Sequence, residues 1–564
     1  MKLFYSYSSA CFTGISFLMF LSVTLSLYVP VQGFVTNKSM RSLYRFLPQE
    51  VPDPYNVKRH ATLQKEELSV ETTQPTVGSV TIIIPSCDVT SKYGSKSPVD
   101  NPTYAEAASQ LANKVYWFSD GTLKVNVIKV NEANNDHLLL NVDVLIALGI
   151  SSLADMESIK RVFEHRRTSG TGKQCQFTLD CVETLPSIVG PYDQASPSFS
   201  STVLPWTNAA TGFRMQQQMM GLFDRWTSDD FSVALMIFVN HFIAEIPWVK
   251  YSIDATWEKG PLRNAQELYA MVSKCGNCIE NCLKDENCKQ CIDALNAVDT
   301  RDQVASYRTI VSFESVLLKD FSYCILTKNN IFGCQADIPQ IPTVQPVARW
   351  RGEPLTVESA QSLLVGHLDD DAAPVGSLKS DISWKVAAGA NVAYDQFPSQ
   401  NQLFYPTVNG RDMWYDPVFR VETMDGRVVW CKRHYKVRNG PIPGTFKLSV
   451  LDNGVTSNEF WTIAGVADDL SWIVFHYAGA ASAVGQRYLG GLVCTPDGAM
   501  PPANMEIWNT LRSVGIEPWE LFCVDNDLTS PGAMMAGPPP LDFYRDDVRK
   551  AKHAKQDMTT AIAE

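Results

Sequence analysis

The residues whose types and spacing most directly suggest chemistry in this sequence are cysteines. Two C-x-x-C pairs in one cluster could supply four thiolates to a tetrahedral zinc ion. Alternatively, cysteines three or four residues apart lie on one face of a helix, and disulfides could then link the arms of a helical hairpin. The spacing leaves both interpretations open and does not give the connectivity. The cluster comprises Cys275, Cys278, Cys282, Cys288, Cys291, Cys324 and Cys334.

The N-terminal residues favour the disulfide interpretation over zinc. Lys2 is followed by an apolar stretch and then Gly33, so residues 1–33 read as a secretory signal with cleavage before Phe34. Residues 34–78 form a basic, hydroxyl-containing leader and linker. Together they resemble the two-part plastid-targeting leader of algae with secondary plastids; plain secretion and a retained anchor are the alternatives. An oxidising route of this kind allows disulfides to form.

A series of alternating strand-like segments near the C-terminus predicts a second structural unit. Asp425-Gly426 is a hairpin signal, and Asp452-Asn453-Gly454 marks another turn. Short turns between neighbouring strands suit a closed antiparallel barrel over residues 381–500, with room for one small ligand. The expected strands are 382–389, 400–406, 414–423, 427–438, 445–451, 458–465, 471–478 and 487–494.

This strand region is rich in aromatic residues. Because side chains alternate along each strand, half of them point into the barrel. An interior of this kind suits a long apolar ligand with a few polar handles. A helix over residues 504–514 follows and is expected to flank the barrel, within a C-terminal part spanning residues 501–564.

Alternating strands and helices over residues 79–270 predict an N-terminal α/β sandwich. Val142–Ile150 is a nearly continuous apolar run, as expected of a strand buried on both faces, and a helix follows it. The turn after that strand lacks the glycine spacing of a nucleotide site, so the role of this domain is left unassigned. Residues 271–340 form the Cys-rich helical module, which includes a helical stretch over Tyr307–Leu326, and residues 341–380 form a linker.

Composition limits the classes of function. The chain has 564 residues, of which 45% are hydrophobic and 19% charged, so it is expected to fold as a multidomain protein around real cores. Its net charge of −12 argues against a nucleic-acid partner, because phosphate binding needs clustered cations.

Several long stretches resemble the violaxanthin de-epoxidase superfamily, whose members carry a lipocalin-like barrel. The similarity is closest to the branch called violaxanthin de-epoxidase-related and covers roughly residues 260–530. The stretches that carry it are Asp302–Tyr307 with Ser312–Ser315, Tyr394–Tyr405, Pro443–Trp461, Asp468–Gly479, Thr495–Gly498 and Trp519–Asn526.

The resemblance implies a plastid protein of the photoprotective xanthophyll cycle, in the thylakoid lumen or at the thylakoid membrane surface. Its expected reaction converts violaxanthin to antheraxanthin and zeaxanthin, or the diatom-type equivalent, with ascorbate as co-substrate and no metal. The resemblance allows a homodimer. The alternatives are a carotenoid epoxide isomerase that needs no reductant and a non-catalytic lipocalin that binds a carotenoid or another lipid.

The family reaction needs an acid beside the epoxide oxygen, because an unprotonated alkoxide is a poor leaving group. In the family an Asp and a Tyr inside the barrel serve this purpose. The Tyr maps onto Tyr477, whereas the Asp position falls on Asn458 or Glu459, depending on whether the strand is aligned without a gap or by Trp461. A shift of one residue reverses the face. An inward Glu459 would have a raised pKa and be a usable acid, whereas an inward Asn458 would leave the donor missing.

Other candidate ligand-binding residues follow from the same resemblance. Asp395 lies in a turn at the expected barrel mouth, where it could bind a ligand end group or hold the loop. His476 neighbours Tyr477 and is therefore expected on the opposite face of the strand. Ser399 and Ala305 stand where the family has Cys, so one or two family disulfides are expected to be absent. The candidate substrate-binding residues are Trp384, Tyr394, Asp395, Gln400, Phe404 and Trp461.

Overall fold

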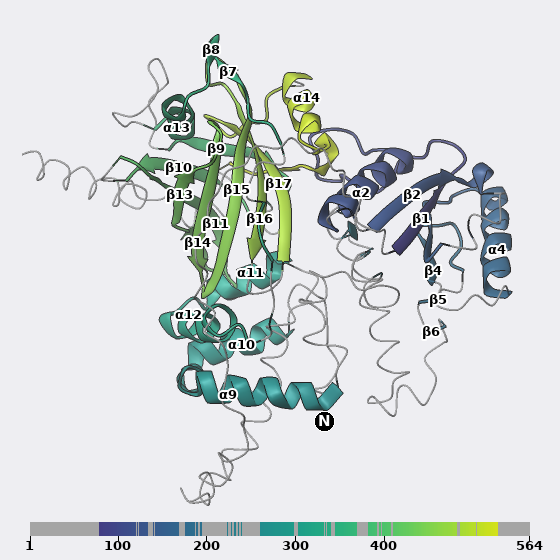
Figure 1. Ribbon diagram of the computed structural model, residues 1–564, viewed down its shortest axis with the longest axis horizontal. Coiled ribbons are helices and arrows are strands. Elements are labelled where there is room, and N and C mark those ends of the chain that lie inside the picture. The colour runs from purple at the N-terminus through teal and green to yellow at the C-terminus, as the bar shows by residue number, and fades with distance from the viewer. Residues whose placement is uncertain are drawn as a thin grey trace, which may run out of the picture.

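The computed structural model describes residues 78–193 and 260–527, with gaps, together with a few positions between 223 and 239 (Figure 1). The predicted signal segment, nearly all of the leader, Cys334 and the end of the C-terminal part lie outside the described residues. Figure 1 shows an α/β unit beside a barrel, with a helical module at one end of the barrel. The predicted multidomain fold class is confirmed.

The α/β unit is built on four parallel strands with helices packed on both faces. Strand order is β2 (Leu123–Lys129), β1 (Gly78–Ile84), β3 (Val144–Leu148), β4 (Cys175–Leu179), then the short antiparallel β5 (Ile188–Val189) and β6 (Tyr192–Asp193). Helix α2 (Tyr104–Phe118) packs on the face that carries Val80 and Ile82, whereas α4 (Leu153–Thr168) packs on the face that carries Ile83 and Leu145. The described helical positions Phe223, Phe231, Leu235 and Val239 pack in the same core as α2. Burial on both faces explains the continuous apolar runs of these strands.

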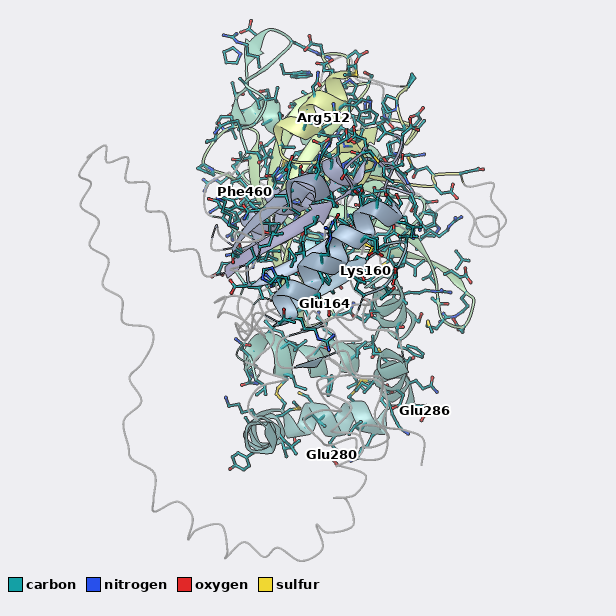
Figure 2. All side chains as sticks on the ribbon, turned by 90° about the vertical axis from the view of Figure 1, so that its right-hand side faces the viewer. Lys160, Glu164, Glu280, Glu286, Phe460 and Arg512 are labelled. Carbon is teal, nitrogen blue, oxygen red and sulfur yellow. A yellow bond between two sulfur atoms is a disulfide. The ribbon has the colours of Figure 1, made fainter. Side chains whose placement is uncertain are left out.

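The Cys-rich module is a set of short helices. Its elements are α9 (Gly260–Lys284), α10 (Glu286–Ala297), α11 (Gln303–Ser312), α12 (Val316–Ser322) and a π-helical turn, η4 (Tyr323–Lys328). Charged side chains such as Glu280 on α9 and Glu286 on α10 stand on the exposed faces (Figure 2). The expected helical stretch Tyr307–Leu326 is formed by parts of α11, α12 and η4. It is interrupted before α12, where Ser315 accepts a hydrogen bond from the Leu318 amide and starts a new helix.

Two disulfides staple this module. Cys275 is bonded to Cys324, and Cys282 to Cys288 across the tip of the α9–α10 hairpin. Cys278 and Cys291 are free thiols, and burial raises the pKa of Cys291 to about 12. A zinc site that uses the two C-x-x-C pairs does not fit, since Cys275 and Cys288 are consumed in the disulfides.

Eight antiparallel strands close into a barrel. The first strand, β9, pairs with β10 on one side and with the last strand, β17, on the other. These two pairings close the sheet into a barrel. The predicted strand 427–438 is divided in the structure: β12 (Val428–Lys432) pairs only with β11, and the barrel wall continues through β13. The barrel strands are β9 (Trp384–Gly389), β10 (Asn401–Pro406), β11 (Met413–Glu422), β13 (Tyr435–Asn439), β14 (Thr445–Asp452), β15 (Val455–Val466), β16 (Ile473–Ala481) and β17 (Gln486–Thr495).

The segments before and after the barrel strands pack against the barrel. The stretch 341–380 contains β7 (Arg349–Trp350), β8 (Glu353–Pro354) and α13 (Val357–Val365), whose Leu363 lies in the barrel core. After β17, helix α14 (Met505–Ser513) covers the outer face of β16 and β17, and η6 (Pro518–Glu520) and β18 (Phe522–Cys523) follow. Within the described part of the chain, no helix combines the length and apolarity needed to cross a membrane.

Candidate functional site

The inner face of the barrel is lined by aromatic rings in mutual contact. The ring centroids of Trp461 and Tyr477 stack 5.5 Å apart, and those of Phe404 and Tyr415 stack 4.4 Å apart. Trp461 lies directly opposite Tyr477 in the pairing of β15 with β16, which puts both side chains on the same face of the sheet. Ordinary alternation along the strands therefore gathers these rings in one interior core.

Glu459 shares this interior. It lies two residues before Trp461 on β15, so its side chain points to the same face. The Trp461 indole N–H and the Tyr488 hydroxyl both donate to its carboxylate, the latter at 2.8 Å. The residue is 7% exposed. Burial raises the pKa of Glu459, and the two hydrogen bonds oppose that rise because they favour the charged form.

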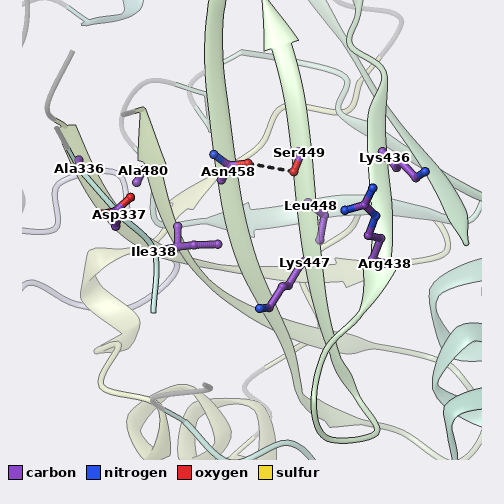
Figure 3. Close-up of a pocket in the computed structure, with 10 residues that line it drawn as sticks. All are labelled: Ala336, Asp337, Ile338, Lys436, Arg438, Lys447, Leu448, Ser449, Asn458 and Ala480. Atoms are coloured by element: carbon purple, nitrogen blue, oxygen red, sulfur yellow. Dashed lines mark hydrogen bonds between the residues drawn. The ribbon is translucent and has the colours of Figure 1, made fainter. Parts of the chain in front are cut away.

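Asn458, by contrast, lies on the outer face of the barrel. It pairs with Ser449 of β14 and Ala480 of β16, and the Ser449 hydroxyl donates to its side-chain oxygen at 2.9 Å. Figure 3 shows the hydrogen bond between these two side chains. Of the two residues between which the sequence could not decide, Glu459 is therefore the one that faces inward with Tyr477.

Two glycines make space for the interior tyrosines. A Cβ on Gly490 would lie 2.3 Å from the Tyr477 hydroxyl, and a Cβ on Gly479 would lie 2.0 Å from the Tyr488 ring. Each glycine also lies directly across the strand pair from the tyrosine that it accommodates. Sequence reasoning missed Tyr488, although a glycine opposite a tyrosine is the signal that marks such a close approach.

The other predicted ligand-binding residues divide into two groups. Phe404 and Trp384 lie in the same core as Glu459, and the Trp384 indole N–H donates to the Leu363 carbonyl at 2.9 Å. Tyr394 instead packs against Tyr307 of α11, with ring centroids 4.9 Å apart. Gln400 holds that loop, because its amide donates to the Tyr394 carbonyl at 2.7 Å.

Asp395 is another buried carboxyl and lies between β9 and β10. It is 2% exposed, and the Asn391 amide donates to it. A Cβ on Gly389 would lie 2.3 Å from its carboxyl, so the glycine permits this close packing. Burial raises the pKa of Asp395 to about 7, against the lowering effect of the Asn391 hydrogen bond.

His476 lies next to Tyr477 on β16, in register with Thr462. It is 2% exposed, so it is a buried outer-face residue of the barrel. Burial lowers the pKa of His476 to about 4, because desolvation disfavours the charged imidazolium.

A closed eight-stranded antiparallel barrel with an aromatic interior defines a lipocalin-type protein, a class that binds hydrophobic ligands. Residues 267–526 match the family model of the VDE lipocalin domain. This chain therefore contains a VDE lipocalin domain. Among curated proteins, no match to the chain was found.

Solved lipocalin structures overlap a quarter of the chain. Lobster apocrustacyanin A1 aligns at 10% identity and a TM-score of 0.20, over 26% of this chain and 78% of its own. Apocrustacyanin C1 aligns at 11% identity and a TM-score of 0.21, over 27% of this chain and 80% of its own. The siderocalin Ex-FABP aligns at 9% identity and a TM-score of 0.20, over 26% of this chain and 93% of its own. Scores this low carry no information on ligand or activity.

Proposed function

We propose that this chain is a xanthophyll-epoxide oxidoreductase of the violaxanthin de-epoxidase type, with Glu459 as the acid. The observation that carries the proposal is a buried interior carboxyl with a raised pKa, set among aromatic rings inside a VDE lipocalin domain. An interior carboxyl without a cationic partner is costly unless it is protonated. A protonated carboxyl in an apolar site is suited to donate to an epoxide oxygen.

The proposed reaction consumes one ascorbate per epoxide. Glu459 gives its proton to the epoxide oxygen, and the carbon–oxygen bond breaks as that oxygen gains the proton. Ascorbate supplies two electrons and two protons in total, so the products are the alkene, water and dehydroascorbate, and Glu459 is protonated again. The hydrogen bonds from Trp461 and Tyr488 stabilise the carboxylate that exists between these steps.

Tyr477 is the second interior group in this proposal. Its ring stacks on Trp461, so it is held at a set position relative to the acid. Because Glu459 and Tyr477 are only 7% and 4% exposed, a polyene reaches them only if neighbouring rings move aside. Asp395 and Gln400 are proposed to contact a ligand end group, a role that also requires movement, because they are only 2% and 5% exposed.

Location and partners follow from the same proposal. Xanthophylls reside in plastid membranes, so a protein that acts on them would work at the thylakoid membrane surface or in the lumen. The two disulfides of the helical module suit an oxidising compartment.

The test is turnover of violaxanthin by the purified chain, with and without ascorbate, across a range of pH. We expect product only with ascorbate, and a rate that falls as the pH rises through the raised pKa of Glu459. Glu459→Gln should lower turnover by about 10²–10⁴-fold, the usual contribution of a general acid. Glu353→Gln, an exposed carboxyl on β8, is the matched control and should leave turnover unchanged.

Other outcomes identify the alternatives. An isomer formed equally well without ascorbate would show a carotenoid epoxide isomerase, which needs the same acid but no reductant. A shift of the carotenoid absorption spectrum without turnover would show a non-catalytic carrier. Unchanged turnover in Glu459→Gln would remove Glu459 as the acid.

A further inference from the structure

Tyr488 reaches Glu459 across an intervening strand. Glu459 of β15 lies directly opposite Gly479 of β16, and Gly479 lies directly opposite Tyr488 of β17. Neighbouring strands lie about 4.8 Å apart, so the two ends of this row are separated by two strand spacings. The Tyr488 hydroxyl nevertheless donates to Glu459 Oε1 at 2.8 Å. The tyrosine ring must therefore lie over the middle strand.

Gly479 provides the space for that ring. A Cβ at position 479 would lie 2.0 Å from Cε2 of Tyr488 and 2.1 Å from its Cζ, both far inside van der Waals contact. A side chain at this position would therefore push the ring away from Glu459. Glycine inside a strand weakens the strand, and it often marks the close approach of another group. Here the group that it admits is the hydroxyl that contacts the interior carboxyl.

The two hydrogen bonds to Glu459 reach different oxygens, and their donors differ in chemistry. Trp461 Nε1 donates to Oε2, whereas the Tyr488 hydroxyl donates to Oε1. An indole N–H can only donate, so Oε2 remains an acceptor in both protonation states of the carboxyl. A tyrosine hydroxyl can donate or accept. When Glu459 is protonated, Oε1 therefore carries the proton and Tyr488 changes from donor to acceptor.

We propose that Tyr488 is the positioning residue of the acid: it keeps the proton of Glu459 on Oε1 and holds the carboxyl in place while that proton leaves and returns. This inference rests on the proposed function, because it assigns Tyr488 a role in the chemistry of Glu459. A charge-assisted hydrogen bond is stronger than a neutral one, so Tyr488 favours the carboxylate over the acid. Burial acts in the opposite direction and raises the pKa of Glu459. The balance allows the acid to give up its proton instead of remaining protonated at every pH.

The titratable groups that face Glu459 are tyrosines from several elements. They are Tyr415 of β11, Tyr435 of β13, Tyr488 of β17 and Tyr394 of the loop between β9 and β10. Burial raises the pKa of each hydroxyl, so all four stay neutral at acid and neutral pH. Tyr477 of β16 faces Tyr488, with ring centroids 6.3 Å apart.

A second carboxyl and a thiol lie near the same group of rings. Tyr415 interacts electrostatically with Asp395 and Cys494 as well as with Glu459. Burial raises the pKa of the Cys494 thiol well above its ordinary value, whereas it raises the pKa of Asp395 to about 7. A titration of the interior must therefore distinguish the signal of Glu459 from that of Asp395.

The test is a pH titration of the full chain by infrared difference spectroscopy, which follows the C=O stretch of protonated carboxyl groups. The band of Glu459 is identified by its loss in Glu459→Gln. In Tyr488→Phe the midpoint of this band should move to higher pH by about one unit, because the charged form loses a hydrogen bond. The fall of violaxanthin turnover with rising pH should move with it. Turnover below the midpoint should drop about tenfold, because the acid is less well placed.

Gly479→Ala should produce the same change by a different route. It keeps the hydroxyl in the chain but displaces the ring, so the midpoint should again move to higher pH. The double variant with Tyr488→Phe should show no further shift, because both substitutions remove the same hydrogen bond. If Gly479→Ala does not fold, Tyr488→Phe decides alone.

Two controls match these substitutions. Tyr435→Phe removes a hydroxyl from the same core but leaves both hydrogen bonds to Glu459 in place. Gly276→Ala on α9 adds a Cβ that would meet nothing within 4 Å. Both should titrate as the wild type does.

This role of Tyr488 and the proposed function can fail separately, because the infrared titration does not depend on activity. A wild type that converts no violaxanthin contradicts the proposed function, whereas the Glu459 band still reports on Tyr488. The role of Tyr488 is overturned if the midpoint is the same in Tyr488→Phe and the wild type, or if Tyr435→Phe shifts it as far.

Discussion

Buried titratable side chains in the barrel respond to pH in opposite directions. Burial raises the pKa of Asp395 to about 7, so the folded state favours its neutral form. The stability from this group is fully present below the unfolded pKa and is lost as the pH rises through 7. Burial lowers the pKa of His476 to about 4, so its stabilising effect is present above its unfolded pKa and is lost as the pH falls through 4. Acidification therefore increases the contribution of Asp395 to the stability of the folded state and decreases that of His476.

Asp395→Asn should remove one of these two responses. Between about pH 4 and pH 7, ionisation of Asp395 costs the folded wild type about 4 kcal/mol at 1.36 kcal/mol per pKa unit. As the pH rises through this range, the free energy of unfolding of the variant should therefore increase relative to that of the wild type. Urea unfolding at several pH values measures the difference. Asp320→Asn, at an exposed position on α12, is the control, and an equal pH slope in Asp395→Asn and wild type would contradict the prediction.

At the scale of elements, a buried arginine joins the helical module to the barrel. Arg433 lies where the predicted strand 427–438 divides into β12 and β13. Its guanidinium contacts Asp452 at 2.7 Å and Glu314 at 3.2 Å, and lies 5.5 Å from the centre of the Tyr307 ring. Because Tyr307 and Glu314 belong to the helical module and Asp452 to β14, one side chain connects both units.

Arg433→Met should destabilise this joint. The Arg433 and Asp452 side chains are 8% and 14% exposed, so the variant leaves a mostly buried carboxylate without its partner, at a cost of about 3 kcal/mol. The control is Arg427→Met, since Arg427 and Asp425 form an ion pair with side chains 62% and 58% exposed. Exposed pairs contribute about 0–1 kcal/mol. Urea unfolding of both variants decides the matter, and equal losses would show that Arg433 has no special role.

At the scale of the whole molecule, the segment after the barrel locks onto the α/β unit. Trp519 belongs to the hydrophobic core of that unit, and the centroid of its ring lies 5.9 Å from that of Tyr93. Lys114 of α2 forms an ion pair with Glu520 at 2.7 Å, with side chains 5% and 2% exposed. A segment within the VDE lipocalin domain thus completes the core of a separate domain.

Trp519→Ala should uncouple the two domains. Removing a large buried aromatic costs about 3–5 kcal/mol, and here the loss falls on the contact between units. We expect one calorimetric unfolding transition in the wild type and two in the variant. Tyr116→Ala on α2 is the control, because that ring is 59% exposed and its removal should cost little. A single transition in Trp519→Ala would show that other contacts couple the domains.

Local patterns in the sequence were sufficient for most of the elements. Alternation and turn residues located the eight barrel strands, except that the predicted strand 427–438 divides into β12 and β13, because a period of two and a hairpin turn depend only on neighbouring residues. The continuous apolar run 142–150 likewise indicated a strand buried on both faces. The break in Tyr307–Leu326 was missed, although Ser315 carried the capping signal.

Only the tertiary structure decided which residues meet. The register of β15 against β14 and β16 places Glu459 inside and Asn458 outside, and no local pattern distinguishes two neighbouring polar residues. The disulfide between Cys275 and Cys324 and the insertion of Trp519 into the core of the α/β unit join segments far apart in the chain. Such contacts depend on how whole elements pack, because their energy comes from burial and charge in three dimensions rather than from neighbours in sequence.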